Sequence, residues 1–232
     1  MLDHSSKLVS VIMTAYNSEK YIKEAIESVF AQSYTNIEII CVDDGSTDAT
    51  GEILKSYRER ITFLSHDTNK GIATGRNTAL AHVHGEFIAF IDADDIWRKD
   101  KLEIQMRAFR EKPTLDIVFG KMNSFVSPEL SEEEKKFRHC PSEPIDAILP
   151  SSACIRKEVF DNVGIFDPKW RVGEFIDWMA KAKDDRVSFE VLPQVLFDRR
   201  IHQTNTGITQ RPSRVDYVRI ARAALLRKRS ME

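Results

Sequence analysis

The first 91 residues alternate between short apolar runs and segments of helical periodicity, and this alternation constrains the fold more than any other feature. In one such segment, apolar residues recur every three or four positions, at Ile22, Ala25, Ile26 and Val29. The apolar runs predict four strands: Leu8–Thr14, Ile37–Val42, Ile61–Ser65 and Glu86–Ile91. The segments between them predict three helices: Glu19–Ala31, Ala49–Arg60 and residues 72–83. Because this order builds βαβ units, we expect an α/β fold with a mostly parallel sheet and helices on both faces.

Beyond Gly120 the pattern is looser. Residues 121–148 combine a charged run, Glu132–Lys136, with three prolines, which predicts a variable, mobile loop or a short exposed helix. Regular structure resumes with a helix near Glu174–Lys183, and the segment Ser213–Arg229 predicts a basic amphipathic helix. We expect one domain organised in three parts, residues 1–120, 121–212 and 213–232.

Composition and charge limit the class of protein. With 232 residues, 42% hydrophobic and 30% charged, the chain is long enough for a globular domain with a buried core. A net charge of −2 argues against a nucleic-acid partner, and no apolar run approaches the roughly 18 residues that span a bilayer. The first residues have too short an apolar stretch for a signal peptide. Cys41, Cys140 and Cys154 are odd in number and far apart, so we expect no disulfide framework, no zinc site and a cytoplasmic location.

Polar clusters directly follow three of the predicted strands. They are Thr14–Asn17, Asp43–Ser46 and Asp92–Asp95. In open α/β sheets, ligands bind outside the carboxyl ends of the strands. We therefore expect the three clusters to meet at one edge of the sheet and to form the functional site.

The last of these clusters places three carboxylates after a buried strand. Asp92 and Asp94, one residue apart where a strand breaks, can flank Mg²⁺ or Mn²⁺, which prefer oxygen ligands and share their shell with phosphates. Such an ion would neutralise a diphosphate leaving group. The alternative is a solvated acidic turn that caps a helix over Arg98–Arg110, with Asp95 as the N-cap.

The second acidic turn and a glycine-flanked arginine support a nucleotide site. A carboxylate at Asp43 can accept a hydrogen bond from a base N–H such as the imide of uracil. Arg76 follows Gly75 at the start of a predicted helix, where arginine and the helix N-terminus both favour phosphate or carbonyl oxygens. Taken alone, Arg76 fits a surface ion pair equally well.

Taken together, these motifs resemble those of the family 2 glycosyltransferases, which have the GT-A fold. The motifs that carry the resemblance are VSVIMTAYN (Val9–Asn17), VDDGSTDAT (Val42–Thr50), NKGIATGRNTAL (Asn69–Leu80), FIDADD (Phe90–Asp95), SSACIRKEVFDNVGIFDP (Ser151–Pro168), GEFIDW (Gly173–Trp178) and RRIHQTNTG (Arg199–Gly207). The likeness runs from Leu8 to Gly207. It implies a GT-A type, Rossmann-like fold in which residues 1–120 bind a nucleotide sugar, residues 121–212 form an acceptor side, and a terminal helix follows.

The resemblance also implies roles at the nucleotide. Thr14, Ala15 and Tyr16 would line the nucleoside pocket, although the family usually carries a proline where Thr14 stands. Asp43 would bind the base. Arg76 would approach the base or hold Asp43.

Around the diphosphate, the resemblance implies a Mn²⁺ or Mg²⁺ site with a DxD motif. Asp92 would meet the ribose or the ion, and Asp94 would be the main protein ligand of the metal. His202 would contact the metal or the diphosphate, with Arg199 or Arg200 nearby.

The catalytic base departs from the family pattern. An inverting transfer needs a carboxylate that deprotonates the acceptor, and the family usually supplies it from a Glu-Asp pair at the start of a late helix. Here the pair is Glu174-Phe175, so the second acid is missing. We expect Glu174 to be the base, with Asp177, three residues on, as helper or second choice. Alternatively, Glu174 is a first-turn residue stabilised by the helix dipole.

The terminal basic helix allows two placements. Such a helix can lie on an anionic membrane surface, or it can pack its apolar stripe on its own domain or on another subunit. We expect packing to be the dominant role, with peripheral contact at the inner membrane face or oligomerisation as further possibilities.

The predicted function is a metal-dependent, inverting glycosyltransferase. It would move a sugar from a nucleotide donor, for which we expect UDP, to a hydroxyl on a glycan, a lipid-linked glycan or a peptide. One alternative is a sugar nucleotidyltransferase, but the segment TAYNSEKYI (Thr14–Ile22) lacks the glycine-rich, lysine-containing loop of that class. A second alternative is a nucleotide-sugar-binding module or pseudoenzyme, which the phenylalanine at position 175 motivates.

Overall fold

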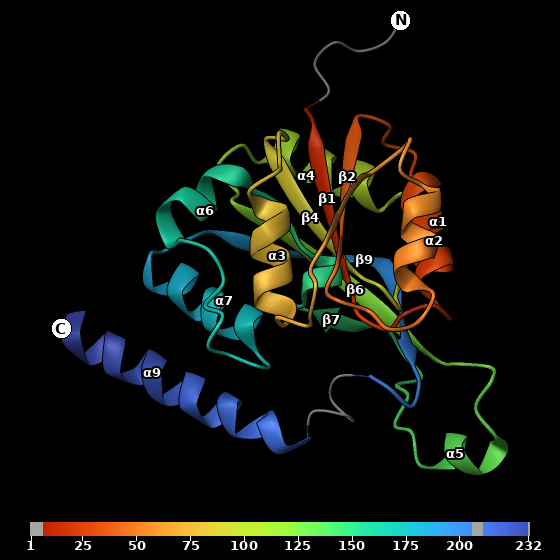
Figure 1. The fold of residues 1–232 in the computed structure, drawn as a ribbon. Helices are drawn as coiled ribbons and strands as arrows, with labels where there is room; N and C mark the ends of the chain where they lie inside the picture. The colour runs from red at the N-terminus through yellow and green to blue at the C-terminus, as the bar shows by residue number, and fades with distance from the viewer. Residues whose placement is uncertain (1–6, 206–210, 232) are drawn as a thin grey trace, which may run out of the picture.

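The computed structural model describes residues 7–205 and 211–231. A nine-stranded sheet runs through the molecule in the order β3-β2-β1-β4-β8-β6-β9-β5, with β7 paired to β6 (Figure 1). Its first four strands are parallel to one another: β1 (Val9–Ala15), β2 (Ile37–Asp43), β3 (Thr62–Ser65) and β4 (Phe87–Asp92). The predicted α/β fold and the order of elements in the first hundred residues are therefore confirmed.

The other half of the sheet is mixed. Its strands are β5 (Ile96–Trp97), β6 (Ile117–Val126), β7 (Ile145–Ala147), β8 (Cys154–Arg156) and β9 (Phe189–Ile201). β8 is antiparallel to β4 and to β6, whereas β6 and β9 are parallel. The β6–β9 ladder shifts register on both sides of Lys121, next to Gly120, where a Cβ atom would lie 2.4 Å from the Leu196 side chain. This close approach requires glycine at the irregular step.

Helices cover both faces of the sheet, as expected, because β1 is apolar on both sides. Val11 and Met13 face one core, together with α1 (Ile22–Phe30), α2 (Thr50–Ser56) and α4 (Lys101–Glu111). Ile12 faces the other core, together with α3 (Ile72–Leu80), α6 (Lys157–Val163) and α7 (Glu174–Asp184). The two groups of helices lie on opposite sides of the sheet in Figure 1.

The segment predicted as a variable loop or a short exposed helix contains such a helix, and also more strand than expected. Residues 121–126 complete β6, and α5 (Glu132–Lys136) and β7 follow within the segment. The side chain of Ser131 accepts from the Glu134 N–H, and the Glu134 carboxylate accepts from the Ser131 N–H, so a capping box starts α5. Two short helical segments, η1 (Pro150–Ser152) and η2 (Arg211–Arg214), lie farther along the chain.

The terminal helix α9 (Val215–Met231) packs along α7, at the lower left of Figure 1. Its Ile220 side chain is buried, and a Cβ atom at Gly173 would lie 2.9 Å from both Ile220 and Tyr217. The predicted packing of this helix on its own domain is thus present. Within the described residues, none of the helices has the length and hydrophobicity to span a bilayer.

Candidate active site

The three polar clusters meet at one edge of the sheet, as predicted. Strand register places Ala15 opposite Asp43 on β2, and Thr14 opposite Asp92 on β4. Because β1 lies between β2 and β4, its carboxyl end is the centre of this edge. Ala15 contributes backbone there, since its carbonyl accepts from the Asp44 N–H at 2.8 Å.

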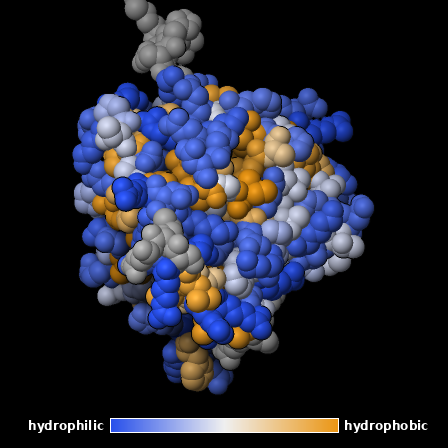
Figure 2. All heavy atoms as spheres, turned by 90° about the vertical axis from the view of Figure 1, so that its left-hand side faces the viewer, coloured by the Kyte–Doolittle hydropathy of each residue, from blue (hydrophilic) through white to orange (hydrophobic). Residues whose placement is uncertain are grey.

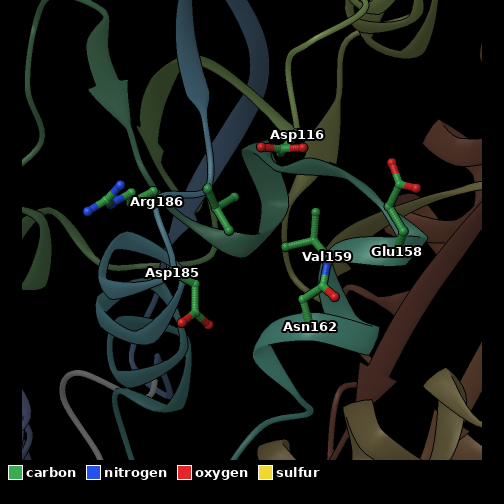
Figure 3. A pocket seen from close by; sticks show the side chains of 7 residues that line it. Asp116, Glu158, Val159, Asn162, Asp185 and Arg186 are labelled. Atoms are coloured by element: carbon green, nitrogen blue, oxygen red, sulfur yellow. The ribbon is translucent and has the colours of Figure 1, made fainter. Parts of the chain in front are cut away.

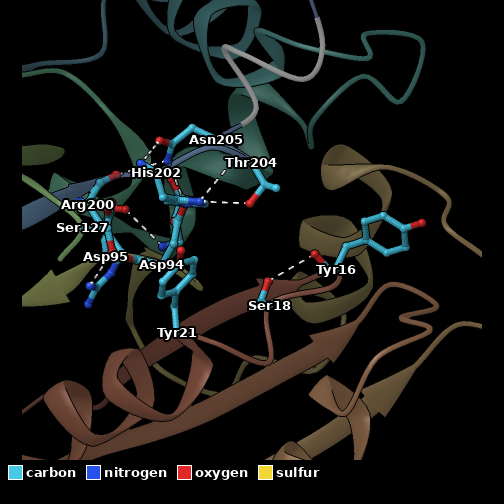
Figure 4. A network of polar contacts seen from close by, with 12 residues as sticks. Tyr16, Ser18, Tyr21, Asp94, Asp95, Ser127, Arg200, His202, Thr204 and Asn205 are labelled. Carbon is cyan, nitrogen blue, oxygen red and sulfur yellow. Dashed lines mark hydrogen bonds and ion pairs between the residues drawn. The ribbon is translucent and has the colours of Figure 1, made fainter. Parts of the chain in front are cut away.

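The turn after β1 is tied to the turn after β2. Asn17 has a left-handed backbone, with φ 48°, and its N–H donates to Ser46 Oγ at 2.9 Å. Its side-chain oxygen accepts from the Thr47 N–H at 2.8 Å. The Tyr16 ring is 47% exposed and stands apart from the carboxylate cluster in Figure 4. Tyr16 therefore offers an open aromatic surface beside two interlocked turns.

The acidic turn after β2 is held largely by backbone donors. Asp43 is buried, and its Oδ1 accepts from the Ser46 N–H at 3.1 Å. Asp44 accepts from the N–H groups of Lys70 and Gly71, at 2.9 and 2.8 Å. Gly71 has φ 93° and immediately precedes α3, so Asp44 fixes the start of that helix.

A buried histidine completes this anchor. His66 Nδ1 lies 2.7 Å from Asp44 Oδ1, and its Nε2 lies 3.0 Å from Thr78 Oγ1 on α3. The imidazole thus connects the end of β3 to the turn after β2 and to the middle of α3. Together with Gly71, these contacts set the position of Arg76 on the same helix.

Arg76 joins two carboxylates from distant parts of the chain. Its side chain is 2% exposed, and its guanidinium lies 2.9 Å from Asp92 Oδ1. A second guanidinium nitrogen donates to Glu174 Oε1 on α7. The predicted contact between Arg76 and Asp43 is not among the hydrogen bonds of the described residues; Arg76 pairs with Asp92 and Glu174 instead.

Asp92 lies at the boundary between this buried group and solvent. Its side chain is 38% exposed. Partial burial raises the pKa of Asp92, and the neighbouring Asp94 and Glu174 raise it further, while Arg76 opposes the rise. Asp92 is thus an acid whose charge depends on a cation beside it.

Asp94 and His202 form the other end of the cluster (Figure 4). Asp94 Oδ2 lies 2.7 Å from His202 Nε2 and accepts from Asn205 Nδ2 at 3.1 Å. His202 Nδ1 lies 2.9 Å from Thr204 Oγ1, and the Tyr21 ring packs 4.5 Å from the imidazole. The structure therefore brings together two of the three residues predicted to contact a metal, although they are 108 positions apart.

The donor set fits a divalent ion that is shared with a ligand. No group of three His, Cys, Asp or Glu side chains that could hold a metal exists in residues 7–205 and 211–231. Asp94 and His202 supply one carboxylate and one imidazole, and Asp94 keeps 26% of its side chain exposed. Two protein ligands on an open edge suit Mn²⁺ or Mg²⁺ that takes its remaining ligands from phosphate and water.

Asp95 and Arg200 hold the backbone of this turn. Asp95 Oδ1 accepts from the Arg200 N–H at 3.2 Å, and Arg200 Nε donates to the Asp94 carbonyl at 3.1 Å. Burial raises the pKa of Asp95 well above its usual range, and Asp94 and Asp92 add to the rise. The alternative of a helix-capping turn is wrong, because α4 begins at Lys101, beyond Asp100, without a side-chain cap.

The two predicted catalytic acids point to different neighbours. Glu174 starts α7 directly after Gly173, whose φ is 80°, and it is buried against Arg76. Asp177 instead faces α9, with Lys181 Nζ at 2.8 Å and Arg227 at 3.4 Å. The structure does not bring Asp177 into the group of Arg76 and Glu174.

Phe175, which stands where the family carries its second acid, belongs to the core. It is 4% exposed and packs against the rings of Phe119, Phe166 and Trp178. A carboxylate could not replace it there without a large desolvation penalty. Glu174 is thus the acid of this segment that reaches the strand-end edge.

Comparison with known sequences decides the family. Residues 10–164, well over half of the chain, match the family described as Glycosyl transferase family 2. The chain belongs to glycosyl transferase family 2.

Two bacterial relatives of the chain are named as transferases of sugars. The family 2 chain is 45% identical over 108 residues to the putative teichuronic acid biosynthesis glycosyltransferase TuaG of Bacillus subtilis, covering 45% of this chain and 43% of TuaG. It is 38% identical over 143 residues to the Escherichia coli UDP-Glc:alpha-D-GlcNAc-diphosphoundecaprenol beta-1,3-glucosyltransferase WfgD, covering 57% and 56%. The chain therefore spans about half the length of these relatives.

Solved structures confirm the GT-A type fold of the family 2 chain. The crystal structure of S. aureus TarS 1-349 superposes with a TM-score of 0.69 and 27% identity, covering 83% of this chain and 60% of TarS 1-349. The complex of TarS 1-349 with UDP-GlcNAc superposes with a TM-score of 0.68 and 26% identity, covering 85% and 59%.

A separate acidic pocket lies away from this edge (Figure 3). It has a volume of about 300 Å³ and is lined by Asp116, Glu158, Val159, Asn162, Asp185, Arg186 and Val187. None of the residues predicted for the family 2 site lines it. We assign it no part in the site.

Sequence reasoning missed several residues that organise the family 2 site. Asp44 and His66 anchor α3, and Asn205 binds Asp94. Arg200, which was expected near the metal or the diphosphate, fixes the backbone of the turn that carries Asp94. Asp44 directly follows the predicted base-binding Asp43, and His66 directly follows β3, so their positions at strand ends were the available signal. Which of them would pair depended on how the strands and α3 pack.

Proposed function

We propose that the chain transfers a sugar from a UDP-linked donor to a hydroxyl acceptor with inversion at the anomeric carbon. One arrangement carries the proposal. Arg76 joins Asp92 and Glu174, and Asp94, two residues after Asp92, pairs with His202, at the strand-end edge of a family 2 chain. The likeness to TarS 1-349 in complex with UDP-GlcNAc, at 26% identity, supports a nucleotide-sugar donor.

In this proposal, the turns after β1 and β2 bind the nucleoside. Thr14, Ala15 and Tyr16 border the nucleoside. One carboxylate oxygen of Asp43 accepts from the Ser46 N–H, and the other accepts from a base N–H. Residues 1–120 supply these groups, and residues 121–212 supply Glu174 and His202. The exposed ring of Tyr16 provides a face on which the base can stack.

Asp94 and His202, with Asp92 beside them, would hold Mn²⁺ or Mg²⁺ against the diphosphate. When bound, the ion supplies positive charge that stabilises the UDP leaving group. Asn205 and Arg200 orient Asp94 from behind, through its side chain and its carbonyl. Asp95 also helps to fix the turn that carries Asp94, because its carboxylate accepts from the Arg200 N–H.

Glu174 is the proposed general base. Its Oε1 accepts from Arg76, which orients the carboxylate, and its Oε2 takes the proton of the acceptor hydroxyl. The acceptor oxygen forms a bond to the anomeric carbon while the bond from that carbon to the diphosphate oxygen breaks. The electron pair of the broken bond leaves with UDP. Asp177, turned toward α9, positions that helix rather than the acceptor.

One observation favours a second candidate, a nucleotide-sugar-binding module without transfer activity. The second acid of the family pair is replaced by the core residue Phe175, so the base function rests on Glu174 alone. The binding half of the site does not depend on that acid. The two candidates differ only in turnover.

Release of UDP from UDP-sugars in the presence of MnCl₂ tests the proposal. We expect nucleotide-dependent stabilisation of about 2.7 kcal/mol at a hundredfold excess over the dissociation constant, and UDP release that Glu174→Gln abolishes. Tight binding with no turnover toward any acceptor would favour the binding module. Absence of any stabilisation by UDP, GDP or dTDP with Mn²⁺ would reject both.

A further inference from the structure

The outer face of α9 carries a surface that the proposed function does not use. This helix lies outside residues 10–164, the part of the chain that matches the family. Its inner face is fixed to the domain: Asp216 accepts from the Arg171 N–H at 3.2 Å, Ile220 is buried, and Arg227 lies 3.2 Å from Asp184. These contacts hold α9 against the domain along its length, so the opposite face of the helix is turned to solvent.

On that outer side, apolar and basic residues alternate along one line. Val218, Arg222, Leu225 and Arg229 are spaced by four, three and four residues, which places them on one stripe of a helix. Val218 is 70% exposed and Leu225 is 62% exposed. In the face of the molecule shown in Figure 2, hydrophobic and hydrophilic side chains are interleaved in the lower half, where α9 comes toward the viewer.

The charge of this face has one sign. Between Val215 and Arg229 the helix has five basic residues, and its single acidic residue, Asp216, is buried on the inner side. Arg227 is paired inward with Asp184 and Asp177, whereas Arg222, Lys228 and Arg229 are exposed. The outer face therefore presents cations among exposed apolar side chains and no carboxylate.

We propose that the outer face of α9 binds the surface of an anionic lipid bilayer. Basic residues interact with lipid headgroups while neighbouring apolar side chains enter the boundary with the acyl chains, and this face combines the two. A polyanion such as nucleic acid would use the cations but leave Val218 and Leu225 in water. A second copy of the chain, joined symmetrically through this face, would place Arg222 and Arg229 against like charges.

The position of α9 would direct the site toward the lipid. Gly173, directly before Glu174, is in contact with Tyr217 and Ile220 of the helix. A membrane bound along the outer face of α9 would therefore lie near the end of α7 at which Glu174 stands. The membrane contact stands on the surface of α9 and does not depend on the proposed function.

Flotation of the whole chain with vesicles tests this proposal. We expect binding to vesicles of phosphatidylcholine mixed with phosphatidylglycerol, little binding to phosphatidylcholine alone, and weaker binding as salt is raised. Reversal of two charges, Arg222→Glu with Arg229→Glu, should weaken binding at least about tenfold, because each basic residue near an anionic surface strengthens binding several-fold. Val218→Ser with Leu225→Ser should weaken it by a similar factor.

A matched control separates surface chemistry from net charge. Lys55→Glu with Arg58→Glu makes the same change in net charge at exposed positions in α2 and just after it. Because α2 packs on the other face of the sheet from α7 and α9, this variant should bind vesicles like the parent chain. All these variants should keep the parent melting temperature, since the altered side chains are exposed. Glu174→Gln should also bind vesicles normally, which distinguishes this proposal from the proposed function.

Three results would overturn the membrane assignment. The first is absence of binding to anionic vesicles by the parent chain. The second is binding that the α9 variants and the α2 control change equally. The third is a different partner: equal affinity for single-stranded RNA, or a concentration-dependent dimer in size-exclusion chromatography that Val218→Ser with Leu225→Ser dissolves.

Discussion

The two acidic turns at the sheet edge have similar sequences and are satisfied in different ways. After β2, Asp43 and Asp44 accept mainly from backbone N–H groups, of Ser46, Lys70 and Gly71. After β4, the carboxylates are met largely by side chains from distant elements: Arg76 on α3 contacts Asp92, and His202 and Asn205, which follow β9, contact Asp94.

This difference separates an anchor from a site that can exchange partners. Backbone donors are fixed by the fold, so Asp44 has no freedom to leave Gly71 without disturbing α3. Asp92 and Asp94 are partly exposed, with 38% and 26% of their side chains open, so both can accept a ligand beside their side-chain partners. Consecutive acids after a strand thus have different functions, depending on whether backbone or side chains satisfy them.

The largest expected effect is the loss of sugar transfer when Glu174 is replaced. Arg76 links this acid to the turn after β4. Glu174→Gln keeps the size of the side chain and an acceptor for Arg76 but removes the base, so sugar transfer should fall by about 10²–10⁴-fold while UDP binding is kept. The rate of UDP release with acceptor present measures this. Asp177→Asn is the matched control and should transfer sugar at nearly the parent rate, because Asp177 faces α9. If Asp177→Asn were as inactive as Glu174→Gln, the role of the base would have to be reassigned to Asp177.

A second experiment compares the turns directly through the metal. Asp94→Asn should lose the Mn²⁺-dependent part of stabilisation by UDP, up to about 2.7 kcal/mol at a hundredfold excess over the dissociation constant. Asp44→Asn should keep a Mn²⁺-dependent response, since its partners are Lys70, Gly71 and His66. Thermal shift with UDP, with and without MnCl₂, measures both. Equal loss in the two variants would show that the turns do not differ in this respect.

In the absence of ligand, substitution in the turn after β2 should lower the free energy of unfolding more than substitution in the turn after β4. Asp44→Ala leaves the Lys70 and Gly71 N–H groups and His66 without their acceptor, so the free energy of unfolding should fall by about 1–3 kcal/mol. Asp94→Asn removes the charge of one of three neighbouring carboxylates, so it should lower the free energy of unfolding by less than Asp44→Ala does. Urea denaturation of both variants gives the comparison. A larger loss in Asp94→Asn would make the second turn the structural one.

The sequence was informative about these turns only as far as local pattern reaches. Apolar runs predicted β1, β2 and β4, and the rule for strand ends then placed Asp43 and Asp92 at one edge, which the register confirms. The partners of Arg76 could not be predicted, because Glu174 is 98 positions away and meets Arg76 only through the packing of α7 on the sheet.

The second half of the chain was harder to predict for the same reason. Residues 121–126 were expected in a loop, yet they extend β6 because β9 offers a parallel partner across an irregular register. That pairing joins segments about seventy positions apart, and charged and proline-rich sequence follows it directly. The periodicity of α9 indicated an amphipathic helix, but only the contacts of Ile220 and Asp216 show which face is covered.

A further pH-dependent effect concerns the helix that follows the second turn. Lys101 on α4 is buried, lies 4.0 Å from the Trp97 ring and donates to Gln105 at 2.8 Å. Burial lowers its pKa from 10.5 to about 7. Between these values the unfolded chain holds a proton that the folded chain lacks, so the stability of the parent should rise with pH by at most about 1.4 kcal/mol per unit.

Lys101→Met should remove this rise, which can be measured as the free energy of unfolding in urea at several values between pH 7 and 10. The variant keeps Asp94 and Asp44 intact, so it also shows how much pH dependence arises outside the turns. A parent chain whose stability is flat across this range would mean that Lys101 is protonated in the folded protein.

The division of the interior by the sheet has a consequence for how this chain can diverge. Val29 on α1 and Trp178 on α7 belong to separate cores on opposite faces of the sheet. The energetic effects of substitutions in the two layers should therefore add almost independently. One layer can drift over evolutionary time while the other is conserved, and recombination between distant homologues along this division should yield chains that still fold.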